Sequence, residues 1–238
     1  MPFQKIVLPT MKEMFVYQME AMILSGELKF GEQLPNEREL ASQMNISRTV
    51  VNSGIQELAK NGFVYIVPRK GTFVNDFKHN GNLGTLTAIF SHGGGRFDMP
   101  MLISLMEYRS INEQKCASLA AQRRTEEDLE TLFALLGELE SCADSDAFAD
   151  VSTKFHRAIF IATHNSIYPL MYNSFEEMIQ VITRILFRNI PAADVCSMLR
   201  KVVDAIEAQD AVLAETLMEE HTAICTEILT QQYPKSLG

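Results

Sequence analysis

Basic and hydroxyl side chains gather at the start of one predicted helix, in the stretch "NISRTVVNSGIQELAKNG" at residues 45–62. Arginine can make a bidentate contact to guanine or to a phosphate, and hydroxyls and free helix amides suit phosphate oxygens. A second basic pair stands in "PRKG", a turn-like segment a few residues later. Residue types of this kind at a helix start and a nearby turn predict contact with a nucleic acid. The candidate contact residues are Ser47, Arg48, Thr49, Asn52, Arg69 and Lys70.

A helix that reads base edges needs an apolar back and a polar front. On a helical wheel Val51, Ile55 and Leu58 form one stripe, while Thr49 and Asn52 face away from it. Ser47 is the expected cap of this helix, at its first turn. A solvated surface helix with an ordinary cap is the alternative interpretation.

The flanking pattern decides between these interpretations. Apolar residues recur at helical spacing over 11–24, and "PNERELASQM" opens with Asn36 and Glu39 in a capping box. Asn45 suits the tight turn that follows, because asparagine tolerates the left-handed conformation. "FVYIV", "PRKG" and "TFV" then read as strand, turn and strand. The order of helix, helix, turn, helix and hairpin predicts a winged helix-turn-helix.

The charge of the chain is unevenly distributed. The 238 residues carry a net charge of −9, but residues 1–80 hold 9 Lys/Arg against 8 Asp/Glu, whereas residues 81–238 hold 12 against 22. An acidic surface repels a polyanion, so a DNA contact is expected from the first third alone. No apolar run is long enough for a membrane span, and the N-terminus lacks the features of a signal peptide. We therefore expect a cytoplasmic protein that does not bind membranes.

Composition breaks at "NDFKHNGNLG" and "SHGGGRFDMP" divide the chain. The sequence predicts a mainly α protein with a winged helix-turn-helix domain over 1–75, a linker over 76–99 that includes a short helix at 83–90, and an all-helical bundle over 100–233. The four cysteines lack C-x-x-C spacing and are expected to be reduced thiols.

The stretch from "LPNERELASQMNISRTVV" through "PRKGTFV" resembles the N-terminal domain of the GntR family of bacterial transcription regulators. The resemblance implies that Arg38, Arg48, Thr49 and Lys70 contact DNA. This chain has Asn52 where the family usually has arginine, which points to adenine rather than guanine in the operator. It also has Gly54 where alanine or valine is usual, and a glycine inside a helix costs about 1 kcal/mol relative to alanine. A softer recognition helix is therefore expected.

The second part resembles the FadR subfamily of these regulators, through "EYRSINEQKCASLAAQRR", "FHRAIFIATHNSIYPLMY" and "AIEAQDAVLAETLMEEH". The resemblance implies an effector-binding bundle that also dimerises. Many members hold a divalent metal through Asp-x-x-x-His and two later histidines. Here Ser152 stands where the motif has its aspartate, four residues before His156. Leu199 stands near the position of the first later histidine, so only His156 and His221 remain as ligands. We expect no cofactor, and a metal held by these two histidines is the minority alternative.

A metal-free pocket for an organic acid or an acyl-coenzyme A ester is the leading prediction for the effector. Arg109 matches the arginine of the subfamily's E-x-R motif and is the expected partner of an anionic group. It could equally pair with Glu113 one turn further along the helix. The candidate effector-binding residues are Arg109, His156, Arg184 and His221.

Enzymatic activity is not expected. No Gly-rich phosphate loop, G-x-S-x-G or H-E-x-x-H motif occurs in the sequence. A helical hydrolase and a dimerisation scaffold with a vestigial pocket are the remaining alternatives. The leading interpretation is a homodimeric regulator on a palindromic double-stranded DNA operator, with a small-molecule effector that changes operator affinity.

Overall fold

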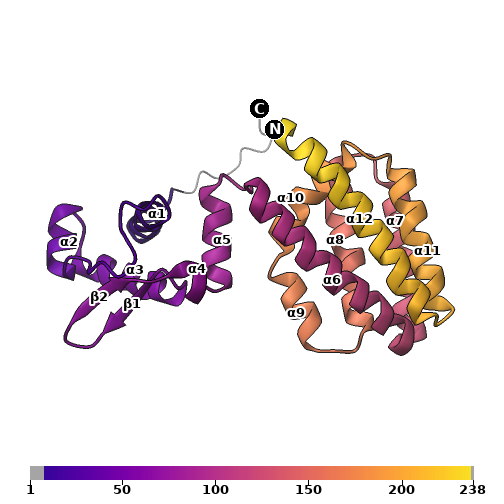
Figure 1. Cartoon of the computed structure of the whole chain (residues 1–238), viewed down its shortest axis with the longest axis horizontal. Coiled ribbons are helices and arrows are strands. Elements are labelled where there is room, and N and C mark those ends of the chain that lie inside the picture. The colour runs from indigo at the N-terminus through magenta and orange to yellow at the C-terminus, as the bar shows by residue number, and fades with distance from the viewer. Residues whose placement is uncertain (1–7, 237–238) are drawn as a thin grey trace. The chain divides into compact units, whose positions relative to one another are not determined.

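The computed structural model describes residues 8–236, with side chains through residue 232, and divides into two compact units, one ending at Gly94 and the other starting at Gly95. Each unit is described by itself (Figure 1). Residues 1–7, predicted to belong to the first domain and to lack a signal peptide, lie outside the described residues. The chain is mainly α, as predicted.

The first unit combines helices with one hairpin. Its elements in chain order are α1 (Met11–Leu24), α2 (Glu37–Gln43), α3 (Arg48–Lys60), β1 (Val64–Val67), β2 (Gly71–Val74), α4 (Phe77–Asn80) and α5 (Leu83–His92). The two strands pair antiparallel, with Val64 opposite Val74 and Val67 opposite Gly71. This is the predicted winged helix-turn-helix.

Local signals predicted from the sequence set the helix boundaries. Asn36 and Glu39 form the capping box of α2, and the Ser47 hydroxyl accepts a hydrogen bond from the Val50 amide at the start of α3. Between these helices Asn45 adopts the left-handed conformation, with φ 52°. The buried faces of α1, α2, α3 and the hairpin then close one hydrophobic core around Phe15, Leu58 and Phe63.

The stretch predicted as a linker over 76–99 is mostly folded. It contains α4 and α5, and α5 begins at Leu83 as expected but continues to His92. The Asn82 side chain donates a hydrogen bond to the carbonyl of Lys60, and Ala88 packs into the core of the first unit. The first unit therefore extends beyond residue 75, and the division falls among the glycines at 93–95. Composition alone missed this because the helix is short and glycines flank it.

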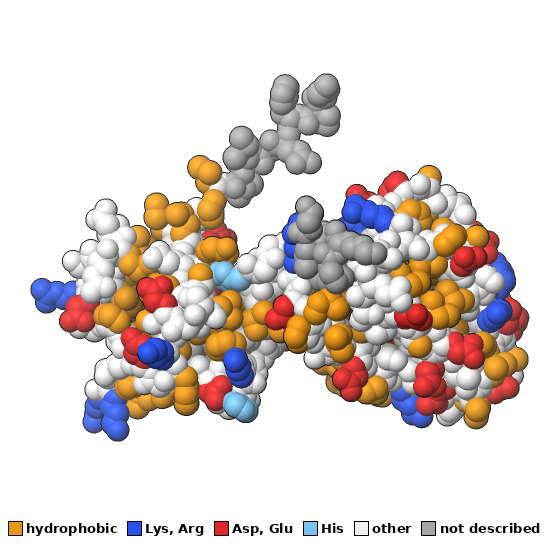
Figure 2. Space-filling view, turned by 45° about the horizontal axis from the view of Figure 1, so that its top comes forward, with side chains coloured by type: hydrophobic (Ala, Val, Ile, Leu, Met, Phe, Trp, Pro, Cys, Tyr) orange, Lys and Arg blue, Asp and Glu red, His pale blue; other side chains and the backbone are white. Residues whose placement is uncertain are grey.

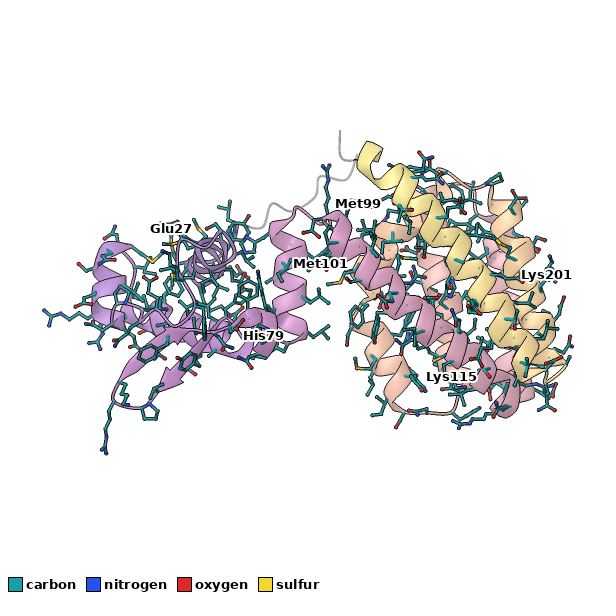
Figure 3. All side chains as sticks on the ribbon, viewed as in Figure 1. Glu27, His79, Met99, Met101, Lys115 and Lys201 are labelled. Carbon is teal, nitrogen blue, oxygen red and sulfur yellow. The ribbon has the colours of Figure 1, made fainter. Side chains whose placement is uncertain are left out.

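The second unit is all-helical over its described residues. Its elements are α6 (Met99–Arg123), α7 (Glu126–Ser141), α8 (Ser145–Ala162), α9 (Ile167–Asn173), α10 (Glu176–Phe187), α11 (Ala192–Glu207) and α12 (Ala211–Ser236). The long helices α6 and α12 pack along each other, and α8 contacts α6, α7 and α10. Side chains from all these helices fill the interior of the bundle (Figure 3). No described helix is long and apolar enough to cross a membrane.

Candidate functional site

The helix α3 has a buried face and an exposed polar face. Val51 and Leu58 have no exposed surface, whereas Arg48, Thr49 and Asn52 are exposed. This is the division that a recognition helix requires, and it matches the division predicted from the sequence.

All seven predicted DNA-contact residues are exposed on the first unit: Arg38, Ser47, Arg48, Thr49, Asn52, Arg69 and Lys70. Basic and acidic side chains both lie on the visible face of this unit and of the second, and several basic side chains project from the first unit (Figure 2). The first third of the chain is close to neutral, whereas residues 81–238 are strongly acidic, so a polyanion is repelled less by the first unit than by the second.

The wing turn holds its two basic residues in a defined backbone. The Lys70 amide donates to the carbonyl of Val67 at 3.0 Å, which closes a four-residue turn with Pro68 second and Arg69, at φ 64°, third. Proline at the second position and a positive φ at the third are typical of a type II turn. Gln33, before α2, donates from its amide to the carbonyl of Lys70 at 2.7 Å and ties the wing to the body of the unit. Sequence reasoning missed Gln33, because its partner lies far along the chain.

An open groove of about 690 Å³ lies between the start of α2 and the wing. Arg69 and Lys70 line it from the wing, and Glu37 lines it from α2. The five other candidate residues lie outside this groove.

Gly54 lies where α1 crosses α3. A Cβ at this position would stand 2.3 Å from Cδ1 of Phe15, whose ring is buried in the core. The alanine or valine usual in the family therefore does not fit here. The glycine allows a close approach of two helices, which the sequence did not reveal.

Asn52 is not an isolated side chain on the exposed face. Its Nδ2 donates a hydrogen bond to Oε1 of Glu37 in α2, at 2.6 Å. Sequence reasoning missed this contact, because the two residues come from different helices.

In the second unit, Arg109 of α6 pairs with a buried carboxylate. Its Nε and Nη2 both lie 2.8 Å from Oε1 of Glu113, one turn along the same helix. Burial lowers the pKa of the guanidinium, but Glu113, with Tyr172 and Cys225, more than offsets this, so the pKa of Arg109 is raised overall. The intrahelical pairing that the sequence left open as an alternative is therefore formed.

Two further candidates, His156 of α8 and His221 of α12, lie beside this pair. Nδ1 of His156 is 3.6 Å from Oε2 of Glu113, and the two imidazole rings stack with centroids 5.7 Å apart. Burial, with the nearby charge of Arg109, lowers the pKa of His156 to about 3. Burial, with His156 as the next cause, lowers the pKa of His221 to about 3 as well. Both rings are therefore neutral at physiological pH.

These residues surround a small enclosed cavity of about 20 Å³, room for about one water molecule. Arg109, His156 and His221 line it together with Ser152 and Cys225. Burial raises the pKa of the Cys225 thiol to about 12, so this cysteine is an inert wall residue rather than a reactive thiol.

Several polar atoms at or near this cavity have no hydrogen-bond partner among the described residues. They are Oε2 of Glu113, Nδ1 of His156, Nδ1 of His221 and the hydroxyl of Tyr172. Buried polar groups normally have hydrogen-bond partners, so this cluster could form hydrogen bonds with a bound molecule. Cys225 and Tyr172 were not predicted as site residues, because nothing in their sequence context separates them from core residues.

Arg184, the fourth effector candidate, does not join the cavity. It lies on α10 with part of its side chain exposed, and its Nε donates to Oδ1 of Asp146 at 2.7 Å. This partner on α8 draws the guanidinium to the surface of the bundle, so the prediction that groups Arg184 with the effector site finds no support in the geometry.

The positions expected for metal ligands also have defined places. Ser152 lines the cavity, whereas Leu199 is a fully buried core residue. Among the described residues, no group of three or more His, Cys, Asp or Glu side chains is arranged to hold a metal ion.

Comparisons with known proteins match both units. The model of the gntR family of bacterial regulatory proteins matches residues 12–74, and the FCD domain model matches residues 104–223, about half of the chain. The chain is 29% identical over 211 residues to the HTH-type transcriptional regulator Mce2R of Mycobacterium tuberculosis, covering 88% of each chain. It is 27% identical over 209 residues to the fatty acid metabolism regulator protein of Proteus mirabilis, covering 87% of this chain and 81% of that protein.

Among solved structures, the fold resembles that of Lar, which is said to control the expression of the Listeria monocytogenes agr system. The TM-score is 0.61 at 19% identity, over 95% of this chain and 99% of that one. The two domain models and the relatives, all of them transcription regulators, confirm the predicted family and the prediction that the protein is not an enzyme. The chain belongs to the GntR family of bacterial regulatory proteins, and it is a ligand-responsive, DNA-binding transcription regulator with an effector-binding FCD domain.

Proposed function

We propose that this regulator binds a palindromic operator as a homodimer and that an organic acid, bound without a metal in the cavity at Arg109, controls operator affinity. Two copies of α3 related by a two-fold axis fit two half-sites of a symmetric operator. The protein acts in the cytoplasm, where its DNA target lies.

The exposed polar face of α3 carries the DNA-binding part of the proposal. Arg48 stands at the first turn, where its guanidinium can reach a guanine edge or a phosphate. Ser47 and Thr49 flank it and suit phosphate oxygens, and Arg69 and Lys70 extend the contact from the wing. Arg38 contributes from α2.

Arg48→Ala tests this assignment. The operator is first selected from a random double-stranded DNA library with the full chain, and affinity is then measured by fluorescence anisotropy. Loss of a bidentate contact should weaken operator binding roughly 10- to 100-fold while leaving thermal stability unchanged, because the side chain is exposed. The matched control is Arg157→Ala, an exposed arginine of α8, which should leave affinity unchanged. Operator affinity that survives Arg48→Ala would remove α3 from the interface.

The unpartnered polar atoms beside Arg109 carry the effector part of the proposal. Each unsatisfied buried group costs about 1–3 kcal/mol, so a ligand that pairs with several of them is favoured. A carboxylate accepts hydrogen bonds from Arg109, from a neutral histidine and from the Tyr172 hydroxyl. A cavity of about 20 Å³ holds no such ligand as it stands, so binding must separate the helices around it.

The effector is either a small organic acid, or a longer acyl-chain acid or its coenzyme A ester. The name of the Proteus mirabilis relative, a fatty acid metabolism regulator, supports the acyl class. Native and denaturing mass spectrometry of the purified protein, with elemental analysis, distinguishes these from the metal-dependent alternative. A released organic acid without metal supports the proposal, and near-stoichiometric zinc, nickel or manganese would overturn the metal-free pocket.

A carboxylate series then tests recognition directly. Organic acids of increasing chain length, each paired with its neutral amide, are added to the full chain, and Tm and operator affinity are measured. Acids that raise Tm and change operator affinity, with amides that do neither, are the expected result. Equal effects of acid and amide on Tm and operator affinity would show that the protein does not recognise the carboxylate.

A further inference from the structure

One hydrogen bond on the exposed face of α3, between Asn52 and Glu37, is not needed for the side chains of that face to contact DNA. Asn52, which stands on that face, is held from the side by Glu37 at the first position of α2. The two helices pack against each other in the first unit (Figure 1). A carboxylate at a DNA-facing surface weakens binding to every sequence, because it repels phosphates. Its position beside a base-reading candidate therefore calls for a specific role.

The chemistry of the contact defines the orientation of the Asn52 amide. An ionised carboxylate only accepts hydrogen bonds, whereas an asparagine amide has a nitrogen that donates and an oxygen that accepts. Nδ2 must therefore face Glu37, as it does at 2.6 Å. The flipped amide would place Oδ1 against the carboxylate oxygen and lose the bond.

The contact leaves Oδ1 and the second N–H of this exposed amide available to a ligand. In the major groove adenine presents a donor at N6 and an acceptor at N7, which match an oxygen and an N–H side by side. Guanine presents two acceptors, O6 and N7, and Oδ1 would face one of them without a hydrogen atom between. An anchored amide therefore accepts adenine and rejects guanine.

We propose that Glu37 is a specificity-determining residue of this regulator, which fixes the Asn52 amide so that α3 reads adenine at one position of each operator half-site. Glu37 acts through Asn52 and does not itself contact a base. The inference rests on the proposed placement of α3 in the major groove.

The test compares variants of the full chain in selections from a random double-stranded DNA library. The affinity ratio for adenine over guanine at the selected position is then measured by fluorescence anisotropy. Asn52→Ala identifies the position, because its preference for adenine should disappear there. Glu37→Ala should reduce the ratio roughly three- to tenfold, the effect of one orienting hydrogen bond. Glu37→Gln should fall between wild type and Glu37→Ala, because a glutamine amide can either accept from Asn52 or donate to it.

The matched control is Glu39→Gln, in the same first turn of α2. The exposed Glu39 accepts from the backbone amide of Asn36 at 3.2 Å, and its bonds belong to that cap rather than to Asn52. Its substitution removes the same charge near the DNA. It should raise affinity for all sequences and keep the ratio, which separates an electrostatic effect from orientation.

A ratio that stays at the wild-type value in Glu37→Ala, while Asn52→Ala loses it, would overturn the role of Glu37. A wild-type operator with no position that depends on Asn52 would overturn it too. If the protein selects DNA but Arg48→Ala binds as tightly as wild type, the proposed interface fails, which is a separate result from either of these.

Discussion

Replacing Gly54 by alanine sets two effects of known size against each other. Helix propensity favours alanine over glycine inside a helix by about 1 kcal/mol. The new Cβ, however, would stand 2.3 Å from Cδ1 and 2.7 Å from Cε1 of Phe15. Distances below 3 Å require a shift, and the Phe15 ring is only 2% exposed, so the surrounding core resists its movement. Overpacking of a filled core costs about 1–3 kcal/mol, or more where nothing yields.

The steric effect should therefore win. We expect Gly54→Ala to lower the free energy of unfolding of the first unit by up to about 2 kcal/mol, which is the overpacking cost less the gain in propensity. For a unit of this size each kcal/mol lowers Tm by roughly 4–8 °C. Hydrogen exchange followed by mass spectrometry on the full chain assigns the change to peptides of α1 and α3.

Gly137 provides the matched control. It lies inside α7, and a Cβ there would meet nothing within 4 Å. Gly137→Ala should therefore stabilise the second unit by up to about 1 kcal/mol, since propensity acts alone. In a Phe15→Leu background, which makes room beside Gly54, the cost of Gly54→Ala should shrink. Equal stabilisation by Gly54→Ala and Gly137→Ala would refute the close approach of α1 and α3.

Three further outcomes follow from the buried cluster of the second unit. Arg109→Ala should destabilise that unit by about 3–5 kcal/mol in chemical denaturation, because it leaves Glu113 buried without its cation, and Arg109→Met with Glu113→Leu should recover most of that loss. Unfolded histidine titrates near pH 6.5, whereas His156 and His221 have a pKa of about 3 in the folded protein, so the unfolded state binds more protons between these values. The contribution of the two histidines to the free energy of unfolding is therefore fully present above pH 6.5. It should fall by about 1.4 kcal/mol per pH unit for each histidine as the pH drops toward 3. His221→Gln should roughly halve this slope in denaturation experiments at a series of pH values. Dialysis against a chelator should leave Tm and operator affinity unchanged, and a fall in either would show that a metal contributes.

Much of the first unit was predictable because its signals are local. The capping box of Asn36 and Glu39, the Ser47 cap and the left-handed Asn45 each depend on residues within a few positions of one another. The apolar stripe of α3 depends only on helical periodicity. Each of these predictions is confirmed by the structure.

The features that sequence reasoning missed depend on contacts between distant segments. Gly54 reads as a soft point in a helix until the ring of Phe15 is placed against it. Asn52 reads as a free amide until Glu37 is placed beside it. In the same way, the sequence suggests Arg184 as a partner of an anionic ligand, whereas in the structure Arg184 forms an ion pair with Asp146. Composition and spacing carry no information about such partners.

The packing of α5 on the first unit holds the end of the recognition helix α3. The last carbonyls of a helix lack partners within the helix. In α3 and its cap two of them, those of Lys60 and Asn61, accept hydrogen bonds from the side chains of Asn82 and Thr85 at the start of α5. Displacing α5 from α3 would leave these carbonyls unsatisfied, so the two helices are held together at that end.

After α5, Gly94 and Gly95 adopt φ values of 67° and 71°. Glycine reaches both signs of φ readily, and a side chain at either position would restrict it. The recognition helix α3 is thus held at two places within the first unit. Its middle packs closely on α1, where Gly54 faces the ring of Phe15, and its last carbonyls accept hydrogen bonds from Asn82 and Thr85. The segment that composition marks as a linker therefore contributes to the packing of the recognition helix.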